Sequence, residues 1–199
     1  MSLVRPIRTV AIYCASSGKS PALYLEAAAR LGRALARSGL AIVYGGGSQG
    51  SMGRLAAAAL DAGGKVTGVL PRFMDELEWG HRSLTELRVV DNMHERKQLI
   101  LELADAVVAL PGGCGTLEEL FEAITWKRLG LYLGPIVLVN VNGFFDSCVQ
   151  LLSRCVEERF MDERHRAMWS VVTEPEAVIQ AIHSAPAWSA AARNFAQVK

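Results

Sequence analysis

Runs of consecutive apolar residues alternate with amphipathic stretches along the whole chain. Four of these runs are AIVY at 41–44, VTGVL at 66–70, AVVAL at 106–110 and IVLVNV at 136–141. They lack the polar alternation of a strand with one face in water, and they are typical of strands covered on both faces. The pattern therefore predicts an α/β fold in which a mainly parallel sheet carries helices on both faces.

The same pattern places the individual elements. Strands are expected at residues 9–14, 41–44, 65–70, 87–90, 106–110, 136–139 and 170–172. Helices are expected at 21–38, 51–62, 93–103, 116–129 and 145–159, and a last helix is expected to open with a capping box at 173–176. Residues 71–85 are expected to form a loop. With no internal repeat and no linker, residues 1–185 are predicted to form a single Rossmann-like domain of about seven strands, followed by a frayed tail at 186–199.

Composition limits the function classes. The 199 residues are 51% hydrophobic, which excludes a disordered chain, and no apolar run approaches the roughly 18 residues of a membrane span. Residues 1–8 lack the apolar segment of a signal peptide, which favours a cytoplasmic protein. A net charge of +1 without a block of Lys and Arg argues against nucleic acid as the partner. Mean hydropathy is +0.21, which suggests apolar surface covered in a homodimer.

Neither the cysteines nor the histidines form a pattern that binds metal. The four cysteines make no C-x-x-C pair, and the four histidines are scattered. Buried reduced thiols are the simple interpretation, and no metal site is predicted.

Two glycine-rich turns follow apolar strands, where ligands bind in parallel sheets. The first is GGGSQGSMG at residues 45–53, whose following helix offers free N–H groups to a phosphate. Gly46, Gly47 and Ser51 are therefore candidate binding residues. The alternative is a turn needed only for helix–sheet packing. A dinucleotide coenzyme would need an acidic residue at the end of the next strand, but Pro71 and Arg72 stand there, which argues against NAD.

The second turn, PGGCGTLEE at residues 111–119, contains a candidate catalytic carboxylate. Thr116 and Glu119 have the spacing of a capping box, so Glu119 could simply bond back to the helix start. If both turns hold the ends of one ligand, Glu119 instead points toward the middle of that ligand. Both interpretations remain open from the sequence.

Arg96 is a candidate partner for this carboxylate. It stands three, four and seven residues before the apolar residues of its helix, so it begins the stripe that faces the sheet. A guanidinium there requires an anion. The alternative is a structural ion pair with Asp105 or Glu119.

Taken together, these residues resemble the LONELY GUY family of cytokinin-activating phosphoribohydrolases. The resemblance covers about residues 8–183. It rests on the two glycine turns, on MHERKQ at 93–98, on ITW at 124–126 and on NVNGFF at 140–145. Many relatives are labelled lysine decarboxylases, but pyridoxal phosphate enzymes are usually far larger chains.

The resemblance implies hydrolysis of the N-glycosidic bond of an N6-prenylated adenosine 5′-monophosphate to free base and ribose 5-phosphate, without a cofactor. Arg96 and Glu119 match the family's catalytic pair. The positions expected to contact the nucleotide are Glu78, Lys97, Gly112, Gly113, Cys114, Gly115, Thr116, Leu117, Glu118 and Thr125. Cys114 stands where relatives often have an aromatic residue.

Two alternatives remain beside this interpretation. One is an enzyme of the same class that acts on AMP or another purine nucleotide. The other is a non-enzymatic protein that binds a nucleotide or a molybdenum-cofactor-type ligand. Arg96 and Glu119 together favour an enzyme, because a carrier has no need of a carboxylate beside the ribose. A homodimer is expected, with apolar residues of 126–133 at its interface.

Overall fold

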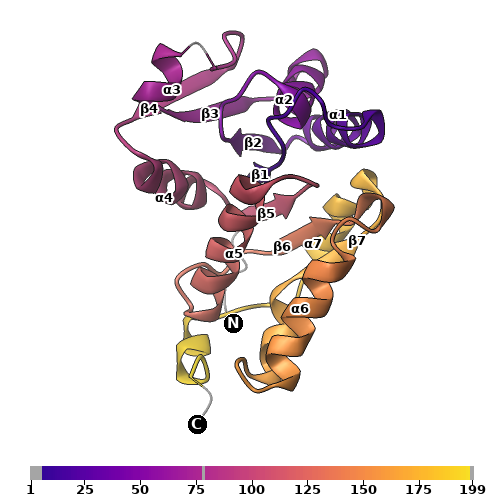
Figure 1. Ribbon diagram of the computed structural model, residues 1–199, viewed down its shortest axis with the longest axis vertical. Coiled ribbons are helices and arrows are strands. Elements are labelled where there is room, and N and C mark those ends of the chain that lie inside the picture. Colours follow the sequence, from indigo (N-terminus) through magenta and orange to yellow (C-terminus); the bar gives the residue numbers. More distant parts are fainter. Residues whose placement is uncertain (1–5, 78, 198–199) are drawn as a thin grey trace.

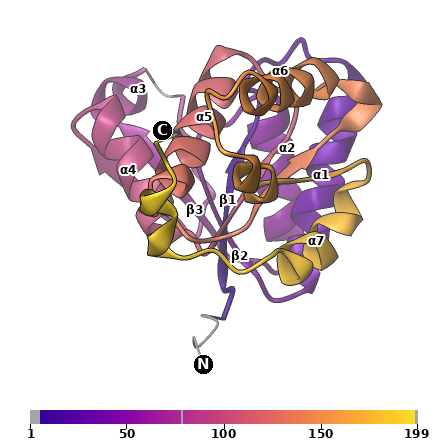
Figure 2. The same ribbon diagram turned by 90° about the horizontal axis from the view of Figure 1, so that it is seen from below.

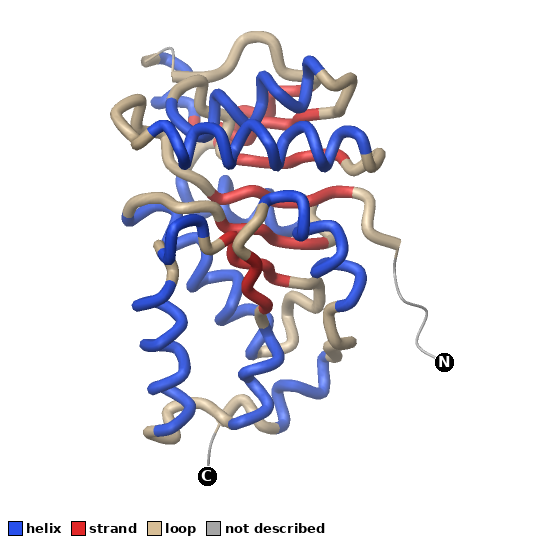
Figure 3. The backbone as a smooth tube through the Cα atoms, turned by 90° about the vertical axis from the view of Figure 1, so that its right-hand side faces the viewer, coloured by secondary structure: helices blue, strands red, loops and turns tan. Residues whose placement is uncertain are grey.

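The computed structural model describes residues 6–77 and 79–197, which form one seven-stranded sheet with helices around it (Figures 1 and 3). All six strand pairings are parallel, in the order β4-β3-β2-β1-β5-β6-β7. The strands are β1 (Thr9–Tyr13), β2 (Ala41–Tyr44), β3 (Val66–Pro71), β4 (Glu86–Val90), β5 (Ala106–Ala109), β6 (Ile136–Val139) and β7 (Ser170–Val172). The prediction of a mainly parallel sheet of about seven strands is confirmed.

Helices cover both faces of the sheet and create two apolar cores. The helices are α1 (Ala22–Arg37), α2 (Gly50–Asp61), α3 (Arg72–Glu76), α4 (Met93–Leu103), α5 (Cys114–Arg128), α6 (Asp146–Glu157) and α7 (Val178–Ser184). Side chains of α1, α2 and α7 pack on one face, and those of α4, α5 and α6 on the other. Figure 2 shows α1, α2 and α7 on one side of the strands and α4 on the other. Val10 and Ile12 of β1 enter the first core and Ala11 and Tyr13 the second, because successive strand residues point to opposite faces.

The order of the strands reverses between β1 and β5. The chain adds β2, β3 and β4 on one side of β1, and β5, β6 and β7 on the other. The carboxyl ends of these two central strands lie together, and the amide of Leu110 donates to the carbonyl of Tyr13 at 2.9 Å. Such a switch point is where ligands bind in open parallel sheets.

Several element boundaries differ from the sequence prediction. The expected loop 71–85 contains the five-residue helix α3, which starts directly after Pro71 and is too short to show a helical period. The helix expected from 116 starts at Cys114, with Gly113 as its N-cap. The capping box expected at 173–176 does not form. A 3-10 turn (Pro175–Ala177) precedes α7, and the glutamates on either side of Pro175 bond to Arg30 instead.

The expectation of a frayed end is wrong for residues 186–197. Trp188 donates from Nε1 to the carbonyl of Lys127 at 2.8 Å, and Phe195 packs on the rings of His165 and Trp188. Arg128 donates to the carbonyl of Ala196. The segment therefore lies beside the last turn of α5 (Figure 1). Two aromatic side chains hold it there, although most of its other residues are small or polar.

Within residues 6–77 and 79–197, no helix combines the length and the apolar composition needed to cross a bilayer.

Candidate active site

The carbonyl groups at the ends of two strands orient the guanidinium of Arg96. This side chain is only 8% exposed and comes from the first turn of α4. Its Nε donates to the carbonyl of Val69 at 3.2 Å, and its Nη2 donates to the carbonyl of Gly45 at 3.1 Å. A β-carbon at position 45 would lie 1.9 Å from Nη2. The first residue of the glycine turn is therefore glycine because the guanidinium occupies the space of a side chain.

Arg96 faces Glu119 across the gap between α4 and α5. The shortest distance between their charged atoms is 3.7 Å, and both side chains are buried. Of the two partners considered for Arg96, the structure selects Glu119, whereas Asp105 accepts from the amides of Arg8 and Thr9. A separation of 3.7 Å is too long for a hydrogen bond, so the Glu119 carboxylate keeps accepting capacity for a water molecule or a hydroxyl group.

The capping-box interpretation of Glu119 is wrong. Because α5 starts at Cys114, Thr116 is its third residue and Glu119 its sixth. A capping box would need Thr116 at the N-cap and Glu119 three residues later in the first turn. Glu119 instead projects into the protein from the second turn and is 5% exposed.

Burial governs the ionisation of this glutamate. Loss of water raises the pKa of Glu119 to about 7, while the charge of Arg96 acts in the opposite direction. Tyr13 and Cys14, at the end of β1, have pKa values raised first by burial and then by the charge of Glu119. A carboxyl group that titrates near neutrality can both accept and return a proton, as general acid–base catalysis requires.

The amino terminus of α5 is open to a ligand. Gly113 and Gly115 are exposed, and no atom lies within 4 Å of a β-carbon placed on either of them. Gly112 is needed for packing, since its β-carbon would lie 2.1 Å from the hydroxyl of the buried Thr116. The first N–H groups of an α-helix have no acceptor within the helix and favour an anion. The exposed first turn of α5 is therefore the better of the two predicted phosphate sites.

The amino terminus of α2 is covered by the loop that follows β1. The amide of Met52 donates to the carbonyl of Ala15 at 3.1 Å. A β-carbon on Gly50 would lie 2.5 Å from the carbonyl oxygen of Ser17. Ser51 is buried, and its hydroxyl has no hydrogen-bond partner among residues 6–77 and 79–197. The structure therefore places Ser51 beneath this loop and not on an open surface.

Gly46 and Gly47 are engaged in a second contact of the same turn. The carbonyl of Gly46 accepts from the amide of His81 at 2.9 Å, and Gly47 forms an isolated bridge with Gly80. Gly46 has a φ of +75°, a conformation that glycine adopts without strain. These contacts correspond to the packing alternative for the turn, and a direct contact with substrate stays a prediction.

Lys97 and Thr125 lie near α5 in different ways. The ammonium of Lys97 donates to Glu118 and lies 3.2 Å from Glu122. The hydroxyl of Thr125 donates to the carbonyl of Phe121, and six residues separate it from Glu119, about 9 Å along a helix. The structure thus does not bring Thr125 to the reactive pair of its own chain.

Three further predicted positions lie in the first turns of α5. Cys114 is exposed beside the open turn, Glu118 is half exposed, and Leu117 packs at the edge of the second core. Glu78 lies outside the described residues.

The loop after β1 was missed from the sequence. Residues 15–20, ASSGKS, leave the carboxyl end of β1 at the switch point, and Ser16, Ser17 and Lys19 are exposed there. The signal was available as a run of Ser and Gly directly between a buried strand and a helix. Hydroxyl and ammonium groups at this position suit an anionic ligand.

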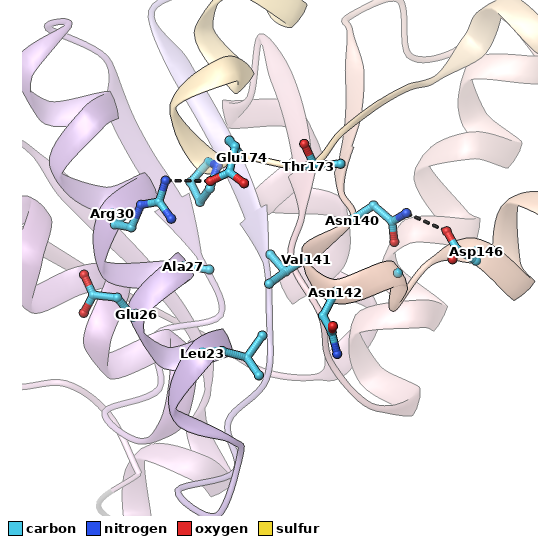
Figure 4. Close-up of a pocket in the computed structure, with 12 residues that line it drawn as sticks. Leu23, Glu26, Ala27, Arg30, Asn140, Val141, Asn142, Asp146, Thr173 and Glu174 are labelled. Atoms are coloured by element: carbon cyan, nitrogen blue, oxygen red, sulfur yellow. Dashed lines mark hydrogen bonds and ion pairs between the residues drawn. The ribbon is translucent and has the colours of Figure 1, made fainter.

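A cavity of about 580 Å³ lies at the same edge of the sheet, beyond β6 (Figure 4). Leu23 and Val141 line it, and the guanidinium of Arg30 bonds to Glu174 at its wall. Because Arg30 is already neutralised and Asp146 adds a further carboxylate, the cavity is a poor site for a phosphate. It contains neither Arg96 nor Glu119.

No metal centre is found in the part of the chain that the structure describes. Among residues 6–77 and 79–197, no group of three or more His, Cys, Asp or Glu side chains is arranged to hold an ion.

An open helix terminus and a buried glutamate–arginine pair at the switch point of a parallel sheet define the class: an α/β protein with a candidate ligand site at the carboxyl ends of its central strands. Sequence comparison gives the family. The model of the family described as "possible lysine decarboxylase" matches residues 52–182. The chain belongs to this family, which includes the LONELY GUY proteins.

Two relatives illustrate the family. The cytokinin riboside 5′-monophosphate phosphoribohydrolase of Rhodococcoides fascians is 43% identical over 178 residues, 89% of this chain and 90% of that protein. The cytokinin riboside 5′-monophosphate phosphoribohydrolase LOG of Oryza sativa is 41% identical over 174 residues, 87% of this chain and 72% of that protein.

Solved structures are similar in fold. The molybdenum cofactor carrier protein of Chlamydomonas reinhardtii matches with a TM-score of 0.69 at 20% identity, over 89% of this chain and 97% of that chain. The molybdenum cofactor binding protein of Rippkaea orientalis matches with a TM-score of 0.68 at 21% identity, over 90% and 97% of the two chains. At these identities the likeness concerns the fold alone.

Proposed function

We propose that this protein is a phosphoribohydrolase that cleaves the N-glycosidic bond of N6-substituted adenosine 5′-monophosphates, releasing the free base and ribose 5-phosphate. The observation that carries the proposal is the buried Glu119 beside Arg96, just below the open amino terminus of α5. The cytokinin riboside 5′-monophosphate phosphoribohydrolases of Rhodococcoides fascians and Oryza sativa, which align with almost the whole chain at more than 40% identity, support it.

The reaction breaks the bond between C1′ of the ribose and N9 of the purine. Positive charge develops on the ribose as the base departs, as in other glycosyl transfers. The Glu119 carboxylate stabilises this charge, orients a water molecule and takes its proton as the water oxygen bonds to C1′. The proton lost from water balances the proton that the departing purine gains. A pKa near 7 suits this exchange at neutral pH.

Substrate positioning depends on the open turn of α5. The N–H groups after Gly113, with Thr116, bind the 5′-phosphate. Glu119 is six residues beyond Gly113, about 9 Å along the helix axis, which is on the scale of a ribose 5-phosphate. Phosphate binding at a distance from the reacting bond contributes rate through orientation. Arg96 holds Glu119 and the ribose hydroxyls in line with it.

The protein is proposed to act as a homodimer in the cytoplasm. Leu129, Leu131 and Leu133 follow the last turn of α5 and are between 41% and 62% exposed, which gives an apolar strip for a second copy to cover. All four cysteines are free, as suits a reducing compartment. Size-exclusion chromatography with light scattering tests the dimer, and a stable monomer at micromolar concentration would contradict it.

Product chromatography tests the activity. The protein is incubated with N6-isopentenyl-AMP and, separately, with AMP, and the Glu119→Gln variant serves as the control. Wild type is expected to release the free base and ribose 5-phosphate, and the variant is expected to bind nucleotide without turnover. The ratio of the two rates identifies the preferred base. Binding measured by calorimetry without release of either base would replace the hydrolase by a carrier.

A further inference from the structure

A second ion-pair cluster joins α4 to α5 beside the reactive pair. Lys97 directly follows Arg96 and is nearly buried, and its ammonium contacts the carboxylates of Glu118 and Glu122. The Glu118 side chain is 54% exposed and that of Glu122 25%, so Glu122 is the more sheltered partner. The hydrogen bond to Glu118, with a smaller contribution from Glu122, raises the pKa of Lys97 and keeps it charged. The two helices are therefore joined by three contacts, one from Arg96 to Glu119 and two from Lys97, to Glu118 and to Glu122.

Three carboxylates lie within five residues of α5, and their charges act on one another. Glu118 is adjacent to Glu119, and Glu122 stands one turn beyond it, where helix side chains are neighbours. Both carboxylates raise the pKa of Glu119, whereas the cations of α4 lower it, after the larger effect of burial. The titratable and charged groups that face Glu119 are Tyr13 at the end of β1 and Cys14 directly after it, Arg96 and Lys97 of α4, and Glu118 and Glu122 of α5.

We propose that the ion pair between Lys97 and Glu122, which lies beside Glu119 on the same two helices, sets the pH range in which Glu119 works. This inference rests on the proposed function, because it assigns Glu122 a role in that reaction. Loss of Glu122 leaves one carboxylate fewer and a less neutralised ammonium, so Glu119 ionises at lower pH. Loss of Lys97 leaves two carboxylates without their cation, so Glu119 ionises at higher pH. Opposite effects of the two partners are the signature of this coupling.

The pH dependence of kcat distinguishes this role from simple support of the helix. The variants are Glu122→Gln and Lys97→Met, and Glu102→Gln is the matched control. Glu102 is an exposed glutamate of α4 that accepts from Gln98, so its replacement removes one charge without touching α5. The acidic limb of the kcat–pH profile is expected to move down by about 0.5–1 pH unit in Glu122→Gln and up by a similar amount in Lys97→Met. In the control variant Glu102→Gln this limb is expected to stay in place.

Two results overturn the proposal. In one, the acidic limb of the kcat–pH profile stays in place in both variants, and in the other it moves in the same direction in both. Should Lys97→Met fail to fold, Glu122→Gln against Glu102→Gln decides, because the ion pair to Glu122 is partly exposed and its loss is tolerable.

A titration without substrate separates this inference from the proposed function. The carbon-13 signal of the Glu119 carboxyl group is identified by its absence in Glu119→Gln and followed against pH in each variant. Midpoints displaced in opposite directions support the coupling, and unchanged midpoints overturn it. Failure of wild type to hydrolyse either nucleotide contradicts the proposed function alone, since the titration needs no turnover.

Discussion

Replacing Gly45 by alanine tests whether the strand carbonyls orient Arg96. The new methyl carbon would lie 1.9 Å from Nη2 and 3.0 Å from Cζ of Arg96. Since van der Waals contact requires about 3.5 Å, the guanidinium must move by about 1.5 Å. That displacement breaks the hydrogen bond to the carbonyl of residue 45 and changes the orientation of the guanidinium relative to Glu119. The φ of Gly45 is outside the left-handed region, so alanine brings no backbone strain.

The size of the effect follows from the contact that is lost. A hydrogen bond to a charged group contributes about 1.5–3 kcal/mol. If this contribution is present in the transition state, kcat is expected to fall about 10- to 100-fold. The assay is release of free base from N6-isopentenyl-AMP, with the thermal midpoint measured in parallel.

Gly63→Ala is the matched control for this substitution. Gly63 has a φ of +77°, and no atom lies within 4 Å of its β-carbon. Alanine there costs about 1–2 kcal/mol of stability through strain and leaves the site intact. The control should melt earlier and keep its rate. A folded Gly45→Ala protein with a rate within twofold of wild type would refute the orienting role of the Gly45 carbonyl.

Three further predictions address the site and the end of the chain. Arg96→Ala is expected to lower kcat at least about a hundredfold, and a loss of thermal stability alone would reduce Arg96 to a structural ion pair. Because the pKa of Glu119 rises from about 4.5 to about 7 on folding, the folded protein holds a proton that the unfolded chain releases between these values, and wild-type stability falls as pH rises through this window. The free energy of unfolding of Glu119→Gln should therefore exceed that of wild type by up to about 3 kcal/mol at pH 8 and be close to it at pH 4.5. Thermal midpoints that are equal for the two proteins at both pH values would contradict the burial argument. Trp188→Ala removes the hydrogen bond to Lys127 and the contact with Phe195 and should cost about 2 kcal/mol in urea unfolding, whereas an unchanged midpoint would indicate a loose C-terminal segment.

The sequence determined the architecture because its strands are covered on both faces. Strands such as 106–110 and 136–139 are apolar at consecutive positions, and this signal depends only on composition within a short window. The short helix α3 was not predicted, because a helix of five residues is too short to show a helical period. The start of α5 at Cys114 was not predicted either, because the glycines on both sides of Cys114 have low helix propensity.

The burial of Arg96 beside a carboxylate was predictable from the sequence, but the geometry of the candidate site was not. The place of Arg96 at the head of an apolar stripe was enough to predict a buried guanidinium that needs an anion. The roles of the two glycine turns depend on long-range contacts that local sequence does not contain. Loop 15–17 covers the start of α2, whereas the start of α5 stays exposed. Likewise the spacing of Thr116 and Glu119 fits a capping box, and only the true helix start rules it out.

The attachment of the C-terminal segment to α5 has a consequence for biosynthesis. Trp188 and Ala196 bond to neighbouring residues at the end of the helix that carries Glu119. During translation α5 leaves the ribosome well before these residues, so a nascent chain can assemble much of the sheet while the far end of α5 still lacks these contacts. A nascent chain that has not yet reached position 188 lacks the contacts that hold the last turn of α5, so that turn is the part of the helix that proteases can reach until residues 188–196 are made.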